Sequence, residues 1–189
     1  MDAATRRAIG DYVRPLAVGL DGMTNYGDIE RMVAASERLA RGREGIDPDL
    51  LFLLAVFSGQ EKWISRMGHR SRTEIFLASA GVPARTIQRL FRGLARFETA
   101  PGSPEEEIVH DAVRLEGMGA YGIARSLAEG YRERLDMLEM AAAVEEAAET
   151  PLRTEEARAL AADRREAMRQ FARRLREEHA EFANPESKI

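Results

Sequence analysis

The sequence has no cysteine, one tryptophan and three histidines among its 189 residues. The absence of cysteine excludes disulfide bonds, thiolate catalysis and metal sites built on cysteine, and it agrees with a reducing compartment. No apolar run approaches the roughly 20 residues of a membrane-spanning helix. The first residues, 1–7, lack the apolar segment of a secretory signal. We therefore expect a cytoplasmic protein with no membrane partner.

Charge of neither sign dominates, since the net charge is only −4, but the charges are unevenly distributed. Residues 62–96 hold eight Lys or Arg and one acid, Glu74, whereas residues 105–149 hold twelve acids and four arginines. Two interpretations stay open. Either the two segments pack together and neutralise each other, or the basic segment forms a face for an anionic ligand.

The hydrophobic pattern is helical almost throughout, and no segment alternates as a half-buried strand does. Asp47 and Pro48 begin an apolar helix over residues 50–57, which we expect to be central. Further helices are predicted over residues 3–18 (bent or ended by Pro15), 29–41 (capped by Asp28), 84–97, 122–140 and 155–182, with two more starting at Ser71 or Thr73 and at Ser103. The first of those two ends at Gly81. The prediction is an all-α, single-domain helical bundle over residues 1–183 and a flexible tail over 184–189.

Three close glycines follow the helix that starts at Ser103. Gly117, Gly119 and Gly122 match the G-x-G-x-x-G pattern of dinucleotide-binding folds. That pattern needs a preceding β-strand within a βαβ unit, and here a helical segment precedes it. The favoured interpretation is a helix-to-helix turn in which the glycines allow close backbone packing.

The residues around these glycines carry a family resemblance. The stretch reads Asp111-Ala-Val-Arg-Leu-Glu-Gly-Met-Gly-Ala-Tyr-Gly-Ile-Ala-Arg125. It resembles the late motif of a bacterial subgroup of the HD superfamily, which are metal-dependent phosphohydrolases. Arg134-Leu135 and residues 152–164 and 168–171 are similar to the closing helix of that subgroup. Together with a looser likeness in the middle, the resemblance covers residues 28–178, and it implies the HD-type helical fold.

The resemblance also implies a divalent metal held by a first His, a His-Asp pair and a later Asp, which activates water against a phosphoester. Asp111 falls on the later Asp, Asp28 on the first His, and Ser58-Gly59 on the His-Asp pair. Serine and glycine are not usual metal ligands, and a further family His is replaced near Arg96. Asp111, with Asp28 as the weaker candidate, could hold Mn, Fe, Mg or Zn if the site survives, and Glu61 is a candidate displaced ligand. Otherwise no cofactor is expected.

Each candidate also has an ordinary structural interpretation. Asp28 alone is a helix N-cap, and Asp111 alone is a buried acid paired with Arg114 or another arginine. His69 is either a pocket-lining residue, as in the subgroup, or a surface loop residue. Adjacent positions on a helix differ by about 100°, so His110 and Asp111 are not expected to face one site. His179 lies among charged residues and is expected to be solvated.

Four arginines form one predicted helix face. Arg85, Arg89, Arg92 and Arg96 follow the spacing i, i+4, i+7 and i+11. Aligned guanidinium groups repel unless acids or phosphates lie close, so an anionic partner is expected. The acidic segment 105–149 is the favoured partner. A nucleotide, another phosphate-bearing ligand or an acidic protein are the alternatives. Nucleic acid is disfavoured, because the net charge is negative and no aromatics interleave the arginines.

Three functions of different classes follow. The first is a non-catalytic, degenerate HD-superfamily protein that recognises a phosphate-bearing or other anionic ligand or a protein partner, with His69, Arg114 and the four arginines as candidate ligand-binding residues. The second is a residual phosphohydrolase acting on a nucleotide or phosphoester. The third binds an anionic partner through the arginine face. The first is favoured because the His-Asp pair is lost at Ser58-Gly59, and a homodimer is compatible with all three.

Overall fold

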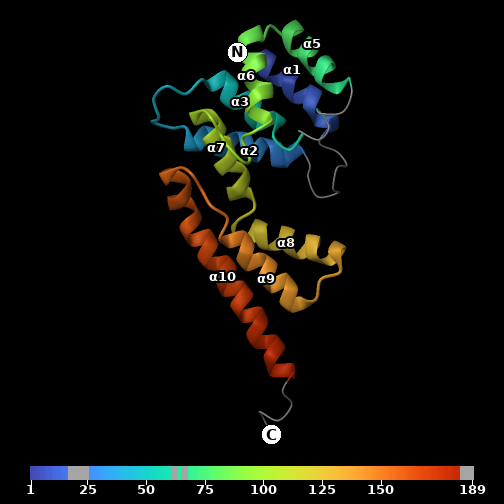
Figure 1. The fold of residues 1–189 in the computed structure, drawn as a ribbon, viewed down its shortest axis with the longest axis vertical. Coiled ribbons are helices and arrows are strands. Elements are labelled where there is room, and N and C mark those ends of the chain that lie inside the picture. The colour runs from blue at the N-terminus through green and yellow to red at the C-terminus, as the bar shows by residue number, and fades with distance from the viewer. Residues whose placement is uncertain (17–25, 61–63, 65–67, 184–189) are drawn as a thin grey trace. The chain divides into compact units, whose positions relative to one another are not determined.

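The computed structural model describes residues 1–16, 26–60, 64 and 68–183 of the protein. Within these ranges every regular element is helical and no strand occurs, which confirms the all-α prediction (Figure 1). The helices are α1 (Ala3–Val13), α2 (Tyr26–Leu39), α3 (Pro48–Phe57), α5 (His69–Ser79), α6 (Ala84–Leu94), α7 (Pro104–Glu116), α8 (Gly119–Glu133), α9 (Met137–Ala148) and α10 (Glu155–Ala183), with a 3-10 turn at Arg14–Leu16. The described residues group into two compact units, Met1–Val113 and Arg114–Ile189. The predicted single domain stays a prediction.

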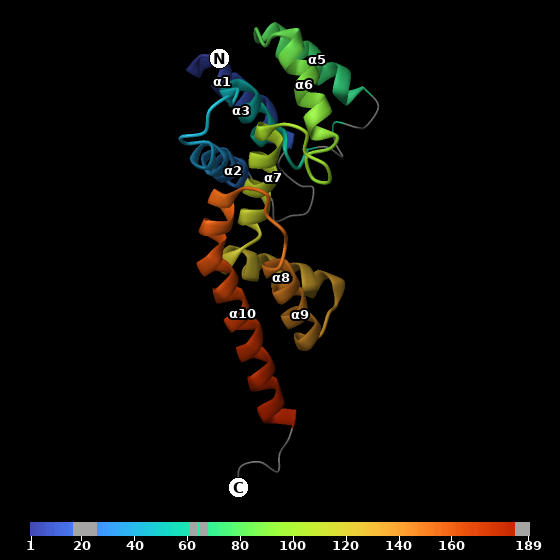
Figure 2. The same ribbon diagram turned by 60° about the vertical axis from the view of Figure 1, so that its left-hand side comes forward.

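The first unit is built around α3. All residues from Leu50 to Phe57 are buried, as the uniformly apolar sequence predicted. Asp47 caps this helix by accepting hydrogen bonds from the backbone N–H groups of Asp49 and Leu50, both at 3.1 Å. Helices α1, α2 and α6 pack on α3, and α5 packs on α6 (Figures 1 and 2). The central position of α3 is therefore confirmed.

The second unit is formed by α8, α9 and α10, which pack pairwise on one another (Figures 1 and 2). The long helix α10 buries Ala157, Ala161, Met168 and Ala172, which share one face of the helix. Arg176 and Arg169 on α10 form ion pairs with Glu145 and Glu149 of the α9 segment, at 2.6 and 2.7 Å.

The helix predicted over residues 122–140 is wrong, because the chain breaks between α8 and α9. Arg134 adopts a left-handed conformation with φ of 63° and ends α8. Asp136 then begins α9 with a capping box, in which its carboxylate accepts from the backbone of Leu138 and Glu139 while Glu139 accepts from the backbone N–H of Asp136 at 2.8 Å. This pair of residues is a start signal that the sequence analysis missed.

Two predicted helix starts also need correction. Helix α2 begins at Tyr26, so Asp28 lies inside its first turn and is not the N-cap. Helix α5 begins at His69 after Gly68, and no side chain caps it. Thr73 instead donates a hydrogen bond from its hydroxyl to the carbonyl of His69 at 3.0 Å. The predicted caps at Ser103 and Gly81 are confirmed, since Ser103 Oγ accepts from Glu106 N and Gly81 has φ of 83°.

The glycine turn between α7 and α8 follows a helix and not a strand. Gly119 has φ of 73°, a conformation that favours glycine, and Gly122 lies so close to the backbone of Gly117 that a side chain there has no room. Arg164 of α10 donates to the carbonyl of Leu115 at 2.8 Å and secures the turn. The helix-to-helix interpretation is confirmed.

No described helix combines the length and the apolar character that crossing a bilayer requires.

Candidate functional site

Asp28 and Ser58-Gly59, where the resemblance places the family's first ligands, lie on α2 and at the end of α3, and these two helices pack together. Ser58 closes α3, and its hydroxyl lies 2.7 Å from the carbonyl of Ala55 and 3.1 Å from the sulfur of Met32 on α2. Met32 is one helical turn after Asp28 and shares its face. The structure therefore brings the Asp28 face of α2 to Ser58, as the resemblance implied.

Asp28 carries a negative charge into this junction, and Arg31 provides the counter-charge. The side chain of Asp28 is only 6% exposed and forms an ion pair with Arg31, one turn later on α2. The Asp-x-x-Arg spacing that produces this pair is readable in the sequence, but the sequence analysis did not use it. Because the guanidinium takes the place of a counter-ion, the charge of Asp28 is compensated without a metal.

Asp111 is fully buried on α7, and its neighbour His110 is buried as well. Nδ1 of His110 lies 2.9 Å from Oδ1 of Asp111. These adjacent side chains contact each other through these two atoms, although helical spacing separates their Cβ directions by about 100°. The sequence did not signal this contact.

The described residues do not supply a metal-binding set. No group of three or more His, Asp or Glu side chains in this part of the chain is arranged to hold an ion. Ser58 directs its hydroxyl at its own helix, and Gly59 has no side chain. Glu61, the candidate displaced ligand, lies outside the described residues. The donor chemistry of Asp28, Ser58, Gly59 and Asp111 thus does not fit the divalent metal of the family.

One buried polar residue near this site was missed. Gln60, two residues after Ser58, is 1% exposed, and its Oε1 makes no hydrogen bond within the described residues. A buried glutamine directly after the apolar α3 is a signal that the sequence contained.

The arginine face of α6 divides into two pairs with different surroundings. Arg89 forms ion pairs with Asp47 at 2.6 Å and with Glu105 at 3.4 Å. Glu105 is 2% exposed and also accepts a hydrogen bond from the backbone N–H of Asp47 at 2.9 Å. Arg89 therefore ties α6 to the start of α3 and to the start of α7.

Arg96 makes the second acidic contact. Its Nε and Nη2 each lie 2.9 Å from a different oxygen of the buried Glu106, and this bidentate hydrogen bonding raises the pKa of Arg96. Glu106 also accepts from the backbone N–H of Gly102 at 2.7 Å. Arg89 and Arg96 thus have acidic partners in segment 105–149, as the favoured interpretation predicted. Arg89 also forms an ion pair with Asp47, which lies outside that segment.

The remaining candidates are placed as follows. Arg85 and Arg92 are exposed on α6, and Arg114 is half-buried near the end of α7. None of these three forms an ion pair within the part of the chain that the structure describes. His69 is half-buried as the first residue of α5, and His179 is exposed on α10, as predicted.

Comparison with known proteins shows the fold. No family model and no curated protein matches the sequence. Among solved structures, the Lin1889 protein of Listeria innocua is similar with a TM-score of 0.76 at 20% identity, over 95% of this chain and 98% of that chain. An HD-superfamily hydrolase of Bacillus thuringiensis has a TM-score of 0.71 at 19% identity, over 94% and 97% of the two chains.

A third similar structure is Bacillus subtilis YpgQ in complex with ADP, with a TM-score of 0.70 at 19% identity, over 93% of this chain and 95% of that chain. The protein thus has the helical fold of an HD-superfamily hydrolase, and the resemblance drawn from residues 111–125 is confirmed at the level of the fold.

Proposed function

We propose that this protein is a degenerate, non-catalytic HD-type protein that recognises a phosphate-bearing ligand without a metal ion. The observation that carries the proposal is the state of the two remaining acids. Asp28 is paired with Arg31, and Asp111 contacts His110, at the positions where the family holds its metal. Ser58 and Gly59 supply no replacement ligands. Arg31 therefore supplies a counter-charge to Asp28, and His110 supplies a hydrogen-bonding partner to Asp111, so side chains of the protein itself contact both acids.

The anionic ligand is assigned to Arg114. This residue is half-buried one turn after Asp111, and it forms no ion pair with any described residue. A half-buried guanidinium without an acidic partner is suited to a phosphate, because its planar fork binds two oxygens at once. YpgQ, which shares the fold, was crystallised with ADP, so ADP is the natural first probe.

The proposal is tested by isothermal titration calorimetry of the full chain with ADP in a buffer that contains a metal chelator. We expect saturable binding that persists in the chelator, with no release of phosphate on prolonged incubation. Arg114→Gln removes a charge-assisted hydrogen bond and should weaken binding by about tenfold or more. Arg38→Gln, on the exposed side of α2, is the matched control and should bind ADP as the wild type does.

Two results would contradict the proposal. One is ADP binding or hydrolysis that appears only when a divalent metal is added, which would favour the residual phosphohydrolase. The other is an absence of ADP and inorganic phosphate binding under all conditions.

A second candidate function is supported by the exposed pair Arg85 and Arg92, which form no ion pair within the described residues. Of the four arginines on this face, Arg89 and Arg96 are already paired with acids, so Arg85 and Arg92 are the two that could bind an anionic partner. If Arg85→Gln/Arg92→Gln abolishes ADP binding while Arg114→Gln does not, the ligand site belongs on α6.

A further inference from the structure

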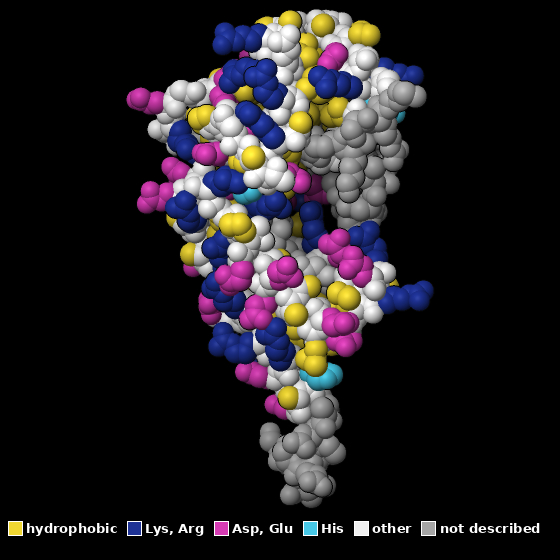
Figure 3. Space-filling view, viewed as in Figure 1, with side chains coloured by type: hydrophobic (Ala, Val, Ile, Leu, Met, Phe, Trp, Pro, Cys, Tyr) yellow, Lys and Arg dark blue, Asp and Glu magenta, His cyan; other side chains and the backbone are white. Residues whose placement is uncertain are grey.

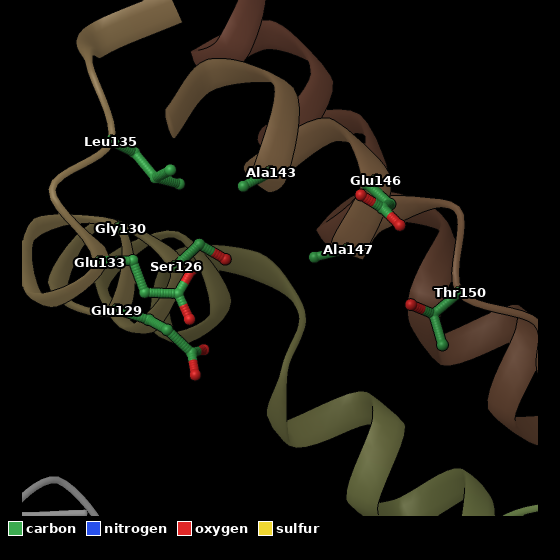
Figure 4. Close-up of a pocket in the computed structure, with 9 residues that line it drawn as sticks. All are labelled: Ser126, Glu129, Gly130, Glu133, Leu135, Ala143, Glu146, Ala147 and Thr150. Carbon is green, nitrogen blue, oxygen red and sulfur yellow. The ribbon is translucent and has the colours of Figure 1, made fainter. Parts of the chain in front are cut away.

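The second unit has a surface groove between α8 and α9, with a volume of about 310 Å³. Its lining includes the small or apolar residues Gly130, Leu135, Ala143 and Ala147 and the acids Glu129, Glu133 and Glu146 (Figure 4). Of the lining residues only Gly130 is buried. The groove is therefore open along the two helices, which suits a helix or an extended segment better than an enclosed small molecule.

The acids of this groove differ from the other acids of α9. Glu145 and Glu149, toward α10, are paired with Arg176 and Arg169. Glu133 and Glu146, toward the groove, form no ion pair within the described residues, and Glu129 has only Arg132 at 3.7 Å. The packing of the second unit thus gives Glu145 and Glu149 ion-pair partners on one side of α9 and leaves Glu133 and Glu146, on the groove side, without one within the described residues.

The first unit shows the complementary situation on α6. Arg85, Gln88 and Arg92 share one exposed face at i, i+3 and i+7, flanked by the small residues Ala84 and Ala95. Arg85 and Arg92 are about 10 Å apart along the helix, and this face carries no acid. Figure 3 shows Lys and Arg side chains over α6, and Asp and Glu side chains over α8 and α9.

We propose that the groove between α8 and α9 is the docking site for helix α6 of a second copy of this chain. Arg85 and Arg92 of one copy pair with Glu133 and Glu146 of the other, while Ala84 and Ala95 allow the helix to approach the apolar lining residues. If each copy gives its helix and receives the partner's, the two contacts close a symmetric dimer. This inference deepens the second candidate function, since it names the anionic partner of the arginine face, and it is independent of ADP binding through Arg114.

The test is sedimentation velocity of the full chain over a range of concentrations, at low and high salt. We expect a monomer–dimer equilibrium that weakens as salt increases, because the pairing is between exposed charges. Arg85→Glu/Arg92→Glu and Glu133→Arg/Glu146→Arg should each raise the dissociation constant at least tenfold. Combining all four substitutions places opposite charges together again and should restore the dimer.

Charge reversal at sites away from both surfaces is the control. Arg7→Glu/Arg41→Glu and Glu177→Arg/Glu181→Arg change the net charge equally at exposed positions and should leave the dimer intact. Circular dichroism checks that each variant folds, and the neutral pairs Arg85→Gln/Arg92→Gln and Glu133→Gln/Glu146→Gln replace any that does not. A wild type that stays monomeric, or a four-substitution variant that fails to recover, overturns the proposal. So does a dimer that neither reversal weakens. ADP titration of the same variants reports separately on the first proposed function.

Discussion

At the scale of single residues, Arg89 and Arg92 lie three positions apart on α6 and have different roles. Arg89 contacts Asp47 and the buried Glu105, whereas Arg92 is exposed and forms no ion pair within the described residues. Glu105 depends on Arg89 for a counter-charge, and one of its carboxylate oxygens already makes no hydrogen bond within the described residues. Arg89 therefore stabilises the fold mainly because it supplies the counter-charge that the buried Glu105 would otherwise lack.

Arg89→Met should lower the free energy of unfolding by about 2 kcal/mol, less than for a fully buried pair because Arg89 itself is half-exposed. Arg92→Met, the same substitution one turn away, should change it by less than about 0.5 kcal/mol. Urea denaturation followed by circular dichroism measures both values. Equal effects at the two positions would show that Glu105 is not compensated by Arg89. A double variant, Arg89→Met/Glu105→Gln, should recover part of the loss.

The sequence predicted part of these contacts for a physical reason. Clustered arginines repel, so a nearby acid was required, and the acidic segment after residue 104 supplied Glu105 and Glu106. It did not indicate Asp47, because an N-cap residue serves its own helix and nothing local shows a distant arginine. The pairing of His110 with Asp111 was missed for the same reason, since helical spacing describes Cβ directions and not the rotation of the side chain beyond them.

At the scale of elements, the turn from α7 to α8 explains Gly119 and Gly122. A Cβ at Gly122 would overlap the backbone carbonyl of Gly117, which has no freedom to move away. At Gly117 itself, a Cβ would lie 3.4 Å from the nearest oxygen, that of Arg114. Gly122 is thus needed for close backbone packing and Gly119 for its positive φ, whereas Gly117 has room for a Cβ.

Gly122→Ala should lower the free energy of unfolding by about 3 kcal/mol, because the strain falls on backbone atoms. The melting temperature should fall strongly as a result. Gly117→Ala is the matched control in the same turn and should cost less than about 1 kcal/mol. Differential scanning calorimetry compares the two. If alanine at position 122 is tolerated as well as at position 117, the close backbone approach in this turn is not present in solution.

Element boundaries were predictable only where a residue type demands a conformation. Gly81, Ser103 and the Asp47-Pro48 pair marked their helix ends correctly because glycine favours positive φ and short polar side chains cap helices. The break at Arg134 carried no such mark, since a non-glycine residue adopts the left-handed conformation there. The capping pair of Asp136 and Glu139 was the available signal.

At the scale of the whole molecule, helical periodicity and one long motif led to the HD-type fold, although the three similar structures named above are only 19 or 20% identical to the chain. Apolar spacing tolerates many substitutions, so the fold survives sequence change that removes a site. Where the resemblance places the family's His-Asp pair, the sequence itself shows Ser58-Gly59. The Asp-x-x-Arg spacing of Asp28 and Arg31 was also readable there, whereas the burial of Asp28 became evident only in the structure.

The central claim is that this fold is maintained here without its metal, and metal content tests it most directly. The full chain is incubated with Mn²⁺, Fe²⁺, Mg²⁺ and Zn²⁺ in turn, freed of excess ion and subjected to elemental analysis. The account predicts far less than one ion of any of these metals per chain, and no change when Asp111 is replaced by Ala. One ion per chain that is lost in Asp111→Ala together with phosphatase turnover would contradict it.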